Sequence, residues 1–120
     1  MKEHHKIKSL KINAIRCENL DEEFATYLQF HLSKLKGVKA FTLFNLKRGF
    51  IFKKKVFTLS ILFESSKLKD ENLNEIGSII RQYYKDRSDF IDFLPLSQDN
   101  KLEKPLFQSI ISCNVHIWNF

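Results

Sequence analysis

The chain has 120 residues, of which 43% are hydrophobic and 12 are phenylalanine, and its formal net charge is +6. This apolar content can form a core, so a disordered basic tail is excluded, and the length suits one domain over residues 1–120 with a frayed start at 1–6. Only 3 glycines and 2 prolines argue against a glycine-rich phosphate loop and a turn-rich sandwich.

Neither a membrane span nor an export signal is predicted. No apolar run approaches the roughly 20 residues that cross a bilayer, and the charged amino-terminal residues are unlike a signal peptide. We therefore expect a cytoplasmic protein without a membrane partner. Cys17 and Cys113 lie far apart and show no C-x-x-C spacing, so we expect two reduced thiols.

The first elements predicted in chain order are a strand and a helix. Residues 7–15 alternate as a half-buried strand does, with an apolar face of Leu10, Ile12 and Ala14. Asn19 and Glu22 have the spacing of a capping box, which predicts a helix start at Asn19. Apolar residues then recur at helical spacing, namely Phe24, Leu28, Leu32 and Leu35. Gly37 marks the predicted end of this helix.

Two long strands joined by a hairpin are predicted next. Residues 38–46 and 56–63 are rich in β-branched and aromatic side chains, which favour strands. Gly49, directly after Arg48, can adopt the positive φ that a tight hairpin requires. We therefore expect an antiparallel pair that turns near Arg48 and Gly49.

The hairpin is followed by a second helix and a short strand. Residues 64–69 are polar and are interpreted as a linker, after which Asp70 is the predicted N-cap of a helix that ends around 85–88. The next strand is predicted over residues 90–94. Pro95 should close it, because proline has no N–H to donate to a sheet.

A third helix and an apolar tail complete the chain. Asp99 or Asn100 is the predicted start of a short helix, in which Pro105 is tolerable only near the first turn. Residues 115–120 are too apolar to remain free and should dock as an edge strand or pack against the sheet. The order β-α-β-β-α-β predicts an α+β plait, an antiparallel sheet with two helices on one face, plus a short carboxyl-terminal helix and an extended tail.

Two segments of this layout carry a family resemblance. Lys-Gly-Val-Lys-Ala at 36–40 follows the amphipathic helix, and Ile-Asp-Phe-Leu-Pro-Leu-Ser-Gln-Asp at 91–99 precedes a short helix and an aromatic terminus. Over residues 7–120 the chain resembles the carboxyl-terminal domain of the enhanced-serine-sensitivity protein (SseB) family. It departs from that family in its Phe- and Lys-rich connection at 48–55 and in His-Ile-Trp at 116–118, where the family tends to end in Pro-Phe-Tyr. The resemblance implies a non-catalytic module and transfers no active-site residues.

The ionisable residues show no pattern that predicts catalysis. His4 and His5 lie in the frayed start, and His31 and His116 lack acidic or cysteine residues at metal-ligand spacing. Helix capping explains the acidic residues Asp21, Glu22 and Glu23. We therefore assign no general acid, base, nucleophile, metal ligand or cofactor site, and we do not expect an enzyme.

An RNA-recognition signature is suggested by Arg-Gly-Phe-Ile-Phe at 48–52, with a companion strand motif at 41–46. In the RNA-recognition fold the companion motif comes first and a helix separates the two. Here they are adjacent across a hairpin, so the aromatic side chains are interpreted as core or partner contacts. Nucleic-acid binding remains the less favoured alternative.

The hairpin is the predicted binding site, because basic residues surround aromatic ones there. Its candidate partner-binding residues are Lys47, Arg48, Phe50, Phe52, Lys53, Lys54 and Lys55. Exposed aromatic side chains would supply contact energy, and the cations would steer an acidic protein partner. The alternative is a solvated basic loop whose aromatic side chains fold inward.

The sequence therefore predicts a non-catalytic protein-binding module. The specific hypothesis is a bacterial immunity protein that neutralises a cognate toxin domain with an acidic patch, and it rests on analogy with other small stand-alone domains. Two alternatives remain: an SseB-like regulatory or interaction domain with another role, and an RNA- or DNA-binding plait that uses the hairpin at 47–55.

Overall fold

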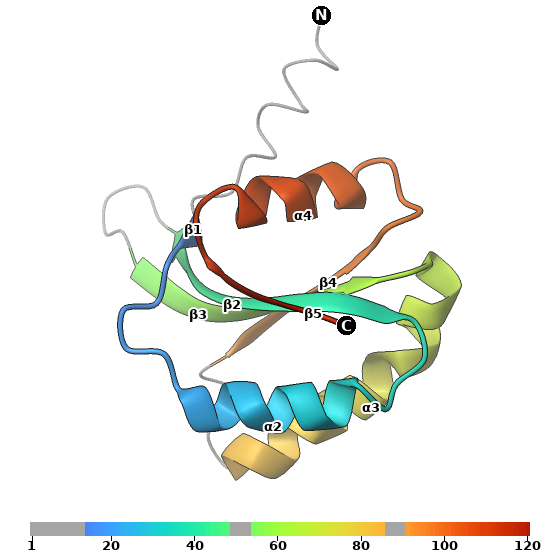
Figure 1. Ribbon diagram of the computed structural model, residues 1–120, viewed down its shortest axis with the longest axis horizontal. Helices are drawn as coiled ribbons and strands as arrows, with labels where there is room; N and C mark the ends of the chain where they lie inside the picture. Colours follow the sequence, from blue (N-terminus) through green and yellow to red (C-terminus); the bar gives the residue numbers. More distant parts are fainter. Residues whose placement is uncertain (1–13, 49–53, 86–90) are drawn as a thin grey trace, which may run out of the picture.

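The computed structural model describes residues 14–48, 54–85 and 91–120 (Figure 1). Most of the first predicted strand, including Leu10 and Ile12, lies outside the described residues, as do His4, His5 and the hairpin turn. The elements in chain order are β1 (Ala14–Ile15), α2 (Glu22–Leu32), β2 (Val38–Arg48), β3 (Lys54–Phe63), α3 (Ser66–Tyr84), β4 (Asp92–Ser97), α4 (Glu103–Ile111) and β5 (His116–Asn119).

The described strands form one five-stranded mixed sheet. β2 and β3 make the predicted antiparallel hairpin, and β1 and β5 both pair antiparallel with the other edge of β2. β4, however, runs parallel to β3. The expectation of a wholly antiparallel sheet is therefore wrong at this pair, because α3 carries the chain back along the sheet before β4 begins. The α+β class and the plait-like arrangement are confirmed.

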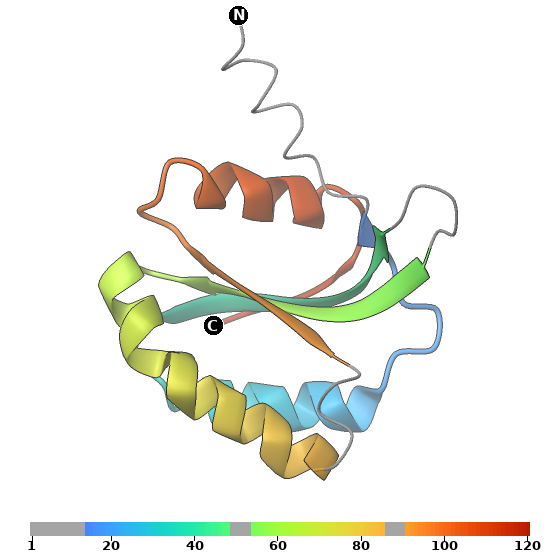
Figure 2. The ribbon, with the colours of Figure 1, turned by 180° about the vertical axis from the view of Figure 1, so that it is seen from behind.

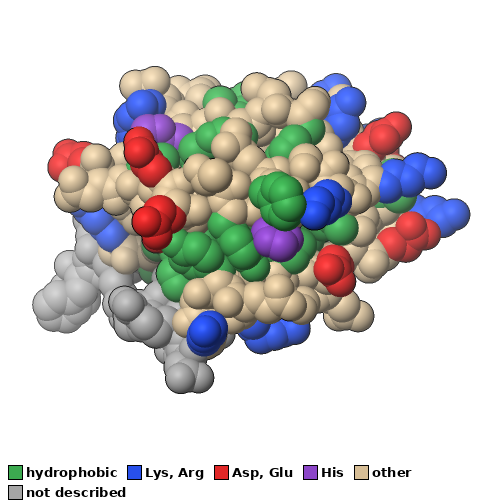
Figure 3. Space-filling model, turned by 60° about the horizontal axis from the view of Figure 1, so that its bottom comes forward, with side chains coloured by type: hydrophobic (Ala, Val, Ile, Leu, Met, Phe, Trp, Pro, Cys, Tyr) green, Lys and Arg blue, Asp and Glu red, His purple; other side chains and the backbone are tan. Residues whose placement is uncertain are grey.

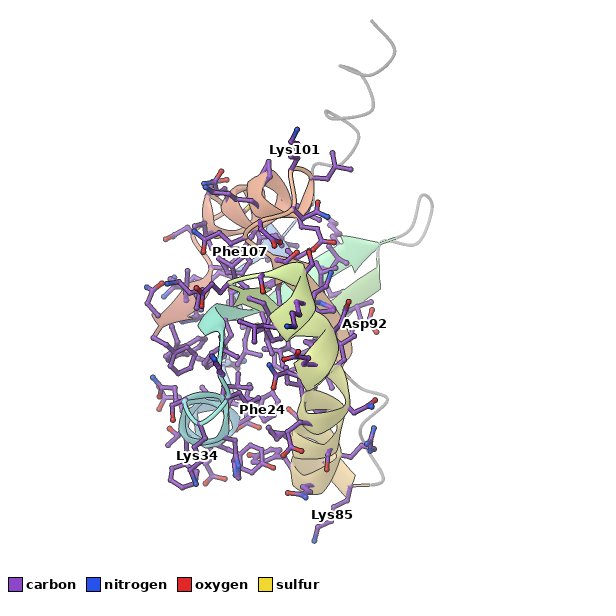
Figure 4. The ribbon with its side chains drawn as sticks, turned by 90° about the vertical axis from the view of Figure 1, so that its right-hand side faces the viewer. Phe24, Lys34, Lys85, Asp92, Lys101 and Phe107 are labelled. Atoms are coloured by element: carbon purple, nitrogen blue, oxygen red, sulfur yellow. The ribbon has the colours of Figure 1, made fainter. Side chains whose placement is uncertain are left out.

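Helices cover both faces of the sheet. α2 and α3 lie side by side on one face, and α4 lies on the other (Figures 1 and 2). Each face has its own hydrophobic core: Phe24 is fully buried among Leu28, Leu43 and Ile76 on the α2 and α3 side, and Phe107 packs in the second core beneath α4 (Figure 4). No helix among the described residues has the length and apolar character that crossing a membrane requires.

The start of α2 differs from the prediction. Asp21, not Asn19, is the N-cap, and its Oδ1 accepts a hydrogen bond from the backbone N–H of Phe24 at 3.1 Å. The expected capping box is therefore wrong, because the helix begins two residues later. The helix ends at Leu32, and a turn leads to Gly37, whose φ of +89° directs the chain into β2.

The start of α3 also lies elsewhere. Ser65 is its N-cap, and the Ser65 hydroxyl accepts a hydrogen bond from the N–H of Leu68 at 3.2 Å. The predicted linker at 64–69 and the predicted cap at Asp70 are therefore wrong. The first turn of α3 looks like a linker in sequence because all of its residues except Leu68 are polar or charged.

Both prolines lie inside regular elements. Pro95 is in the middle of β4, so the prediction that it closes the strand is wrong; β4 forms an edge of the sheet, where a residue without an N–H is tolerated. Pro105 lies in the first turn of α4, as predicted. The Asn100 side chain accepts hydrogen bonds from the N–H groups of Leu102 and Glu103 at this helix start. The expected docking of the tail as an edge strand is also confirmed, by the pairing of β5 with β2.

Candidate functional site

The predicted partner-binding residues lie at the end of the β2–β3 hairpin. Lys47 and Arg48 are the last two residues of β2, and Lys54 and Lys55 are the first two of β3. The remaining predicted residues, Phe50, Phe52 and Lys53, lie outside the described residues. We use the name basic hairpin end for Lys47, Arg48, Lys54 and Lys55.

The strand register places like charges directly opposite each other. Lys47 pairs with Lys55, and Arg48 pairs with Lys54. Like charges at opposed positions of an antiparallel pair destabilise a sheet. The Lys47–Lys55 pair therefore brings two positive charges together at a cost in folding free energy.

One of these pairs belongs to the sheet face that carries α2 and α3. Side chains alternate along a strand, so Lys47 shares a face with Leu43, which is part of the core beneath those helices. Lys55 is exposed, whereas Lys47 is half-buried. The cation of Lys55 is therefore accessible to a molecule that approaches this side of the hairpin.

A hollow of about 580 Å³ adjoins Lys55. It is bounded by the segment between β1 and α2, by the hairpin and by Tyr84 at the end of α3. Its lining carries both signs of charge, since Arg16 and Lys55 are joined by Glu18 and Asp21. The carboxylates in this hollow would repel the phosphates of a nucleic acid, whereas a protein surface can offer side chains of both charges. The mixed charge beside the excess of cations therefore favours a protein over a nucleic acid.

The one thiol that lines this hollow is poorly placed for chemistry. Cys17 is only 6% exposed, and burial raises the pKa of its thiol. A raised pKa keeps the sulfur protonated near neutral pH, and the thiol is a far weaker nucleophile than the thiolate. The ring Nε2 of His116 lies 3.1 Å from the backbone oxygen of Cys17, so that contact links β5 to the segment before α2.

A second cluster of polar side chains lies where β4 ends between α3 and α4. The Glu103 carboxylate accepts hydrogen bonds from the Lys69 ammonium at 3.0 Å and from the N–H and hydroxyl of Ser97, both at 2.8 Å. Ser66 connects this group to Asp99, because its hydroxyl lies 2.9 Å from the Ser97 hydroxyl and its N–H and hydroxyl donate to Asp99 Oδ1. Because these groups satisfy one another, the cluster joins the two helix starts to β4 and is a structural connection.

The electrostatics of this cluster follow from its contacts. Partial burial alone would raise the pKa of Glu103, but the hydrogen bonds from Lys69 and Ser97, with the charge of Lys69, outweigh it and hold the pKa below its ordinary value. The carboxylate is therefore ionised in the folded protein at neutral pH. Within the described ranges, no group of three or more His, Cys, Asp or Glu residues is arranged to hold a metal ion.

Sequence reasoning missed an exposed aromatic surface on α2. Phe30 is 57% exposed, the Lys34 ammonium lies 3.8 Å from its ring centroid, and the His31 ring packs edge-on against it. His31 also contacts Tyr27, with ring centroids 4.3 Å apart. Figure 3 shows hydrophobic side chains and a histidine gathered on this side of the molecule. Phe30 could have indicated this surface in the sequence, because it is a large apolar residue away from the core-facing positions of the helix.

Comparisons with known proteins leave the family open. No family model matches the chain, and no match was found to a curated protein or to a solved structure. The resemblance to the SseB family therefore stays a prediction.

Proposed function

We propose that the chain is a non-catalytic protein-binding module, specifically a bacterial immunity protein that binds and neutralises a cognate toxin domain in the cytoplasm. The observation that supports the proposal is the like-charge match of Lys47 with Lys55 directly across the hairpin. An arrangement that costs folding free energy is compatible with a site retained for binding. The immunity role itself rests on analogy between small stand-alone domains.

Charge determines what kind of partner this site suits. The net charge of +6 and the basic hairpin end favour an acidic partner surface, and electrostatic attraction would accelerate encounter. The carboxylates of Glu18 and Asp21 beside Lys55 would contact basic residues at the rim of the same partner. Neutralisation would then occur by one-to-one coverage of the toxin's active site or substrate groove.

Affinity capture with two charge-matched variants tests the proposal. Lys47→Ala/Lys55→Ala removes two cations from the hairpin, and Lys101→Ala/Lys104→Ala removes two exposed cations from the start of α4. We expect the first variant to associate with the captured toxin about tenfold or more slowly at low salt, and the second to bind as the wild type does. Co-production with wild-type protein should then protect bacteria that make that toxin.

The same experiment separates a protein partner from a nucleic acid. If capture yields RNA or DNA, and the hairpin variant weakens binding to all sequences with a smaller salt slope, the chain is a nucleic-acid-binding protein and the immunity proposal fails. It fails equally if the captured protein binds the hairpin variant and the α4 variant alike. Nuclease treatment before capture distinguishes direct protein binding from bridging through nucleic acid.

A further inference from the structure

β5 presents an open backbone edge. It pairs only with β2 among the described strands, and in Figure 1 it crosses in front of that strand. The N–H of Phe120 donates to the carbonyl of Lys39 at 2.9 Å, so these opposed residues form a hydrogen-bonded pair. Hydrogen-bonded and non-hydrogen-bonded pairs alternate in an antiparallel ladder. The backbone N–H and C=O groups of Ile117 and Asn119 therefore point away from β2.

Apart from its short length of four residues, this edge shows, among the described residues, none of the features that normally block strand addition. The sequence of β5 is His-Ile-Trp-Asn, which contains no lysine and no proline, and its register with β2 shows no bulge. Ile117 is 37% exposed, and Phe120 directly after the strand is 47% exposed. An unprotected apolar edge of this kind is a template for another strand.

Hollows flank the edge on both faces of the sheet. One of about 630 Å³ lies between β5 and α2, where His116 and Trp118 form part of its wall. Another of about 310 Å³ lies towards α4, where Ile117 and Asn119 contribute to the lining. Side chains of an added strand alternate between the faces, so both sets would have space beside β5.

We infer that the β5 edge pairs antiparallel with the β5 edge of a second copy of this chain. A two-fold axis at Trp118 places Ile117 opposite Asn119 of the second copy, and Asn119 opposite Ile117 of the second copy. All outward backbone groups of the two residues then find partners. The two Trp118 side chains face each other on the α2 side, and the exposed Ile117 side chains are covered on the α4 side.

The charges along the edge favour a second copy as the occupant. Glu18 and Glu22 line the hollow at the His116 end of β5, whereas Lys39 lies opposite Phe120 at the other end. All three charged residues are exposed. An antiparallel two-fold arrangement brings the acidic end of each copy beside the basic end of the other. The edge is therefore complementary to itself in charge as well as in hydrogen bonding.

This dimer is independent of the proposed function. β5 covers the stretch of β2 from Ala40 to Leu43, and the basic hairpin end begins beyond it at Lys47. A two-fold dimer through β5 therefore leaves two hairpins accessible. Its test needs no toxin, so failure of the dimer and failure of the immunity proposal are distinguishable.

Sedimentation velocity of the purified chain over a range of concentrations tests the inference. We expect the mass to rise towards twice that of the monomer. Trp118 is the single tryptophan, so dilution should also shift its fluorescence to longer wavelength as the dimer dissociates. Ile117→Lys places a charge on the edge, and Asn119→Pro removes an N–H that does not bond to β2; each should weaken dimerisation at least about tenfold.

The matched control is Leu102→Lys. Leu102 is 57% exposed and lies away from β5, at the start of α4, so this variant makes the same change of charge and polarity without touching the edge. It should dimerise as the wild type does. Far-ultraviolet circular dichroism checks folding, and if Asn119→Pro is unfolded the comparison of Ile117→Lys with Leu102→Lys decides the question.

Several results would overturn the inference. One is a monomeric mass for the wild type at the highest soluble concentration. Another is a dimer that Ile117→Lys leaves intact, and a third is a dimer that Leu102→Lys weakens equally. Binding of an unrelated protein's strand along β5, with no self-association, would also replace a second copy as the occupant.

Discussion

Replacing Lys55 by glutamate should stabilise the folded protein, although it removes a cation from the proposed binding site. In the structure Lys55 lies directly opposite Lys47, so the change converts a repulsive cross-strand pair into an attractive one. Lysine and glutamate both have low strand propensity, so the backbone preference changes little.

The magnitude follows from Coulomb's law. Two unit charges about 6 Å apart in water interact by about 0.7 kcal/mol, and reversal of the sign makes the change about 1.4 kcal/mol at low salt. Screening at about 0.15 M salt roughly halves this, to about 0.7 kcal/mol. For a domain of this size that corresponds to a rise in Tm of about 2–4 °C.

Urea denaturation of the wild type, of Lys47→Glu, of Lys55→Glu and of the double variant measures the effect. Lys47→Glu and Lys55→Glu should each raise the free energy of unfolding, and the double variant should fall well short of their sum because two carboxylates then oppose each other. The gain of each single variant should shrink as salt is added. Single variants no more stable than the wild type, or additive gains in the double variant, would refute the argument from register.

Three further predictions concern the positions that hold the fold together. Glu103→Gln should destabilise the protein by about 1–3 kcal/mol in thermal denaturation, because it leaves the half-buried Lys69 without its ionic partner. Folding lowers the pKa of Glu103, so the stability that its ionised carboxylate contributes is complete above the unfolded-state pKa near 4.5. This contribution is lost as the pH falls through the lower folded-state pKa. Glu103→Gln should not show this loss of stability at acid pH. Gly37→Ala should lower the free energy of unfolding by at least about 1 kcal/mol, because the φ of Gly37 is +89° and the new Cβ would lie 2.5 Å from Leu68 Cδ1. An unchanged free energy of unfolding in chemical denaturation would contradict this conformation of the turn. Phe24→Ala should cost about 3–5 kcal/mol, since the ring is fully buried, and a loss below about 1 kcal/mol would mean that the core beneath α2 is placed wrongly.

Local patterns were sufficient for the hairpin and for α2. The β-branched and aromatic composition of 38–46 and 56–63, with Gly49 between them, predicted the hairpin, and the helical spacing of Phe24 and Leu28 predicted α2. The helix starts were harder, because several polar residues near each start can act as a cap. Ser65 and Asp70 both fit the residue preference, and in the structure it is the Ser65 hydroxyl that caps α3 by accepting from the N–H of Leu68.

Long-range arrangement could not be read from the sequence in the same way. The parallel pairing of β4 with β3 depends on where α3 returns the chain, which no short pattern encodes. The opposition of Lys47 and Lys55 follows from a hairpin register that the sequence did not specify. The hollow beside Lys55 unites Arg16, Lys55 and Tyr84, which come from distant parts of the chain and meet only after folding.

Lysine-reactivity footprinting tests the proposed binding surface most directly. The chain is labelled with an acylating reagent, with and without the captured partner, and the labelled lysines are identified by mass spectrometry. We expect Lys47 and Lys55 to become protected in the complex, whereas Lys101 and Lys104 at the start of α4 should react as in the free chain. Unchanged reactivity at Lys47 and Lys55 in a saturated complex would contradict this expectation.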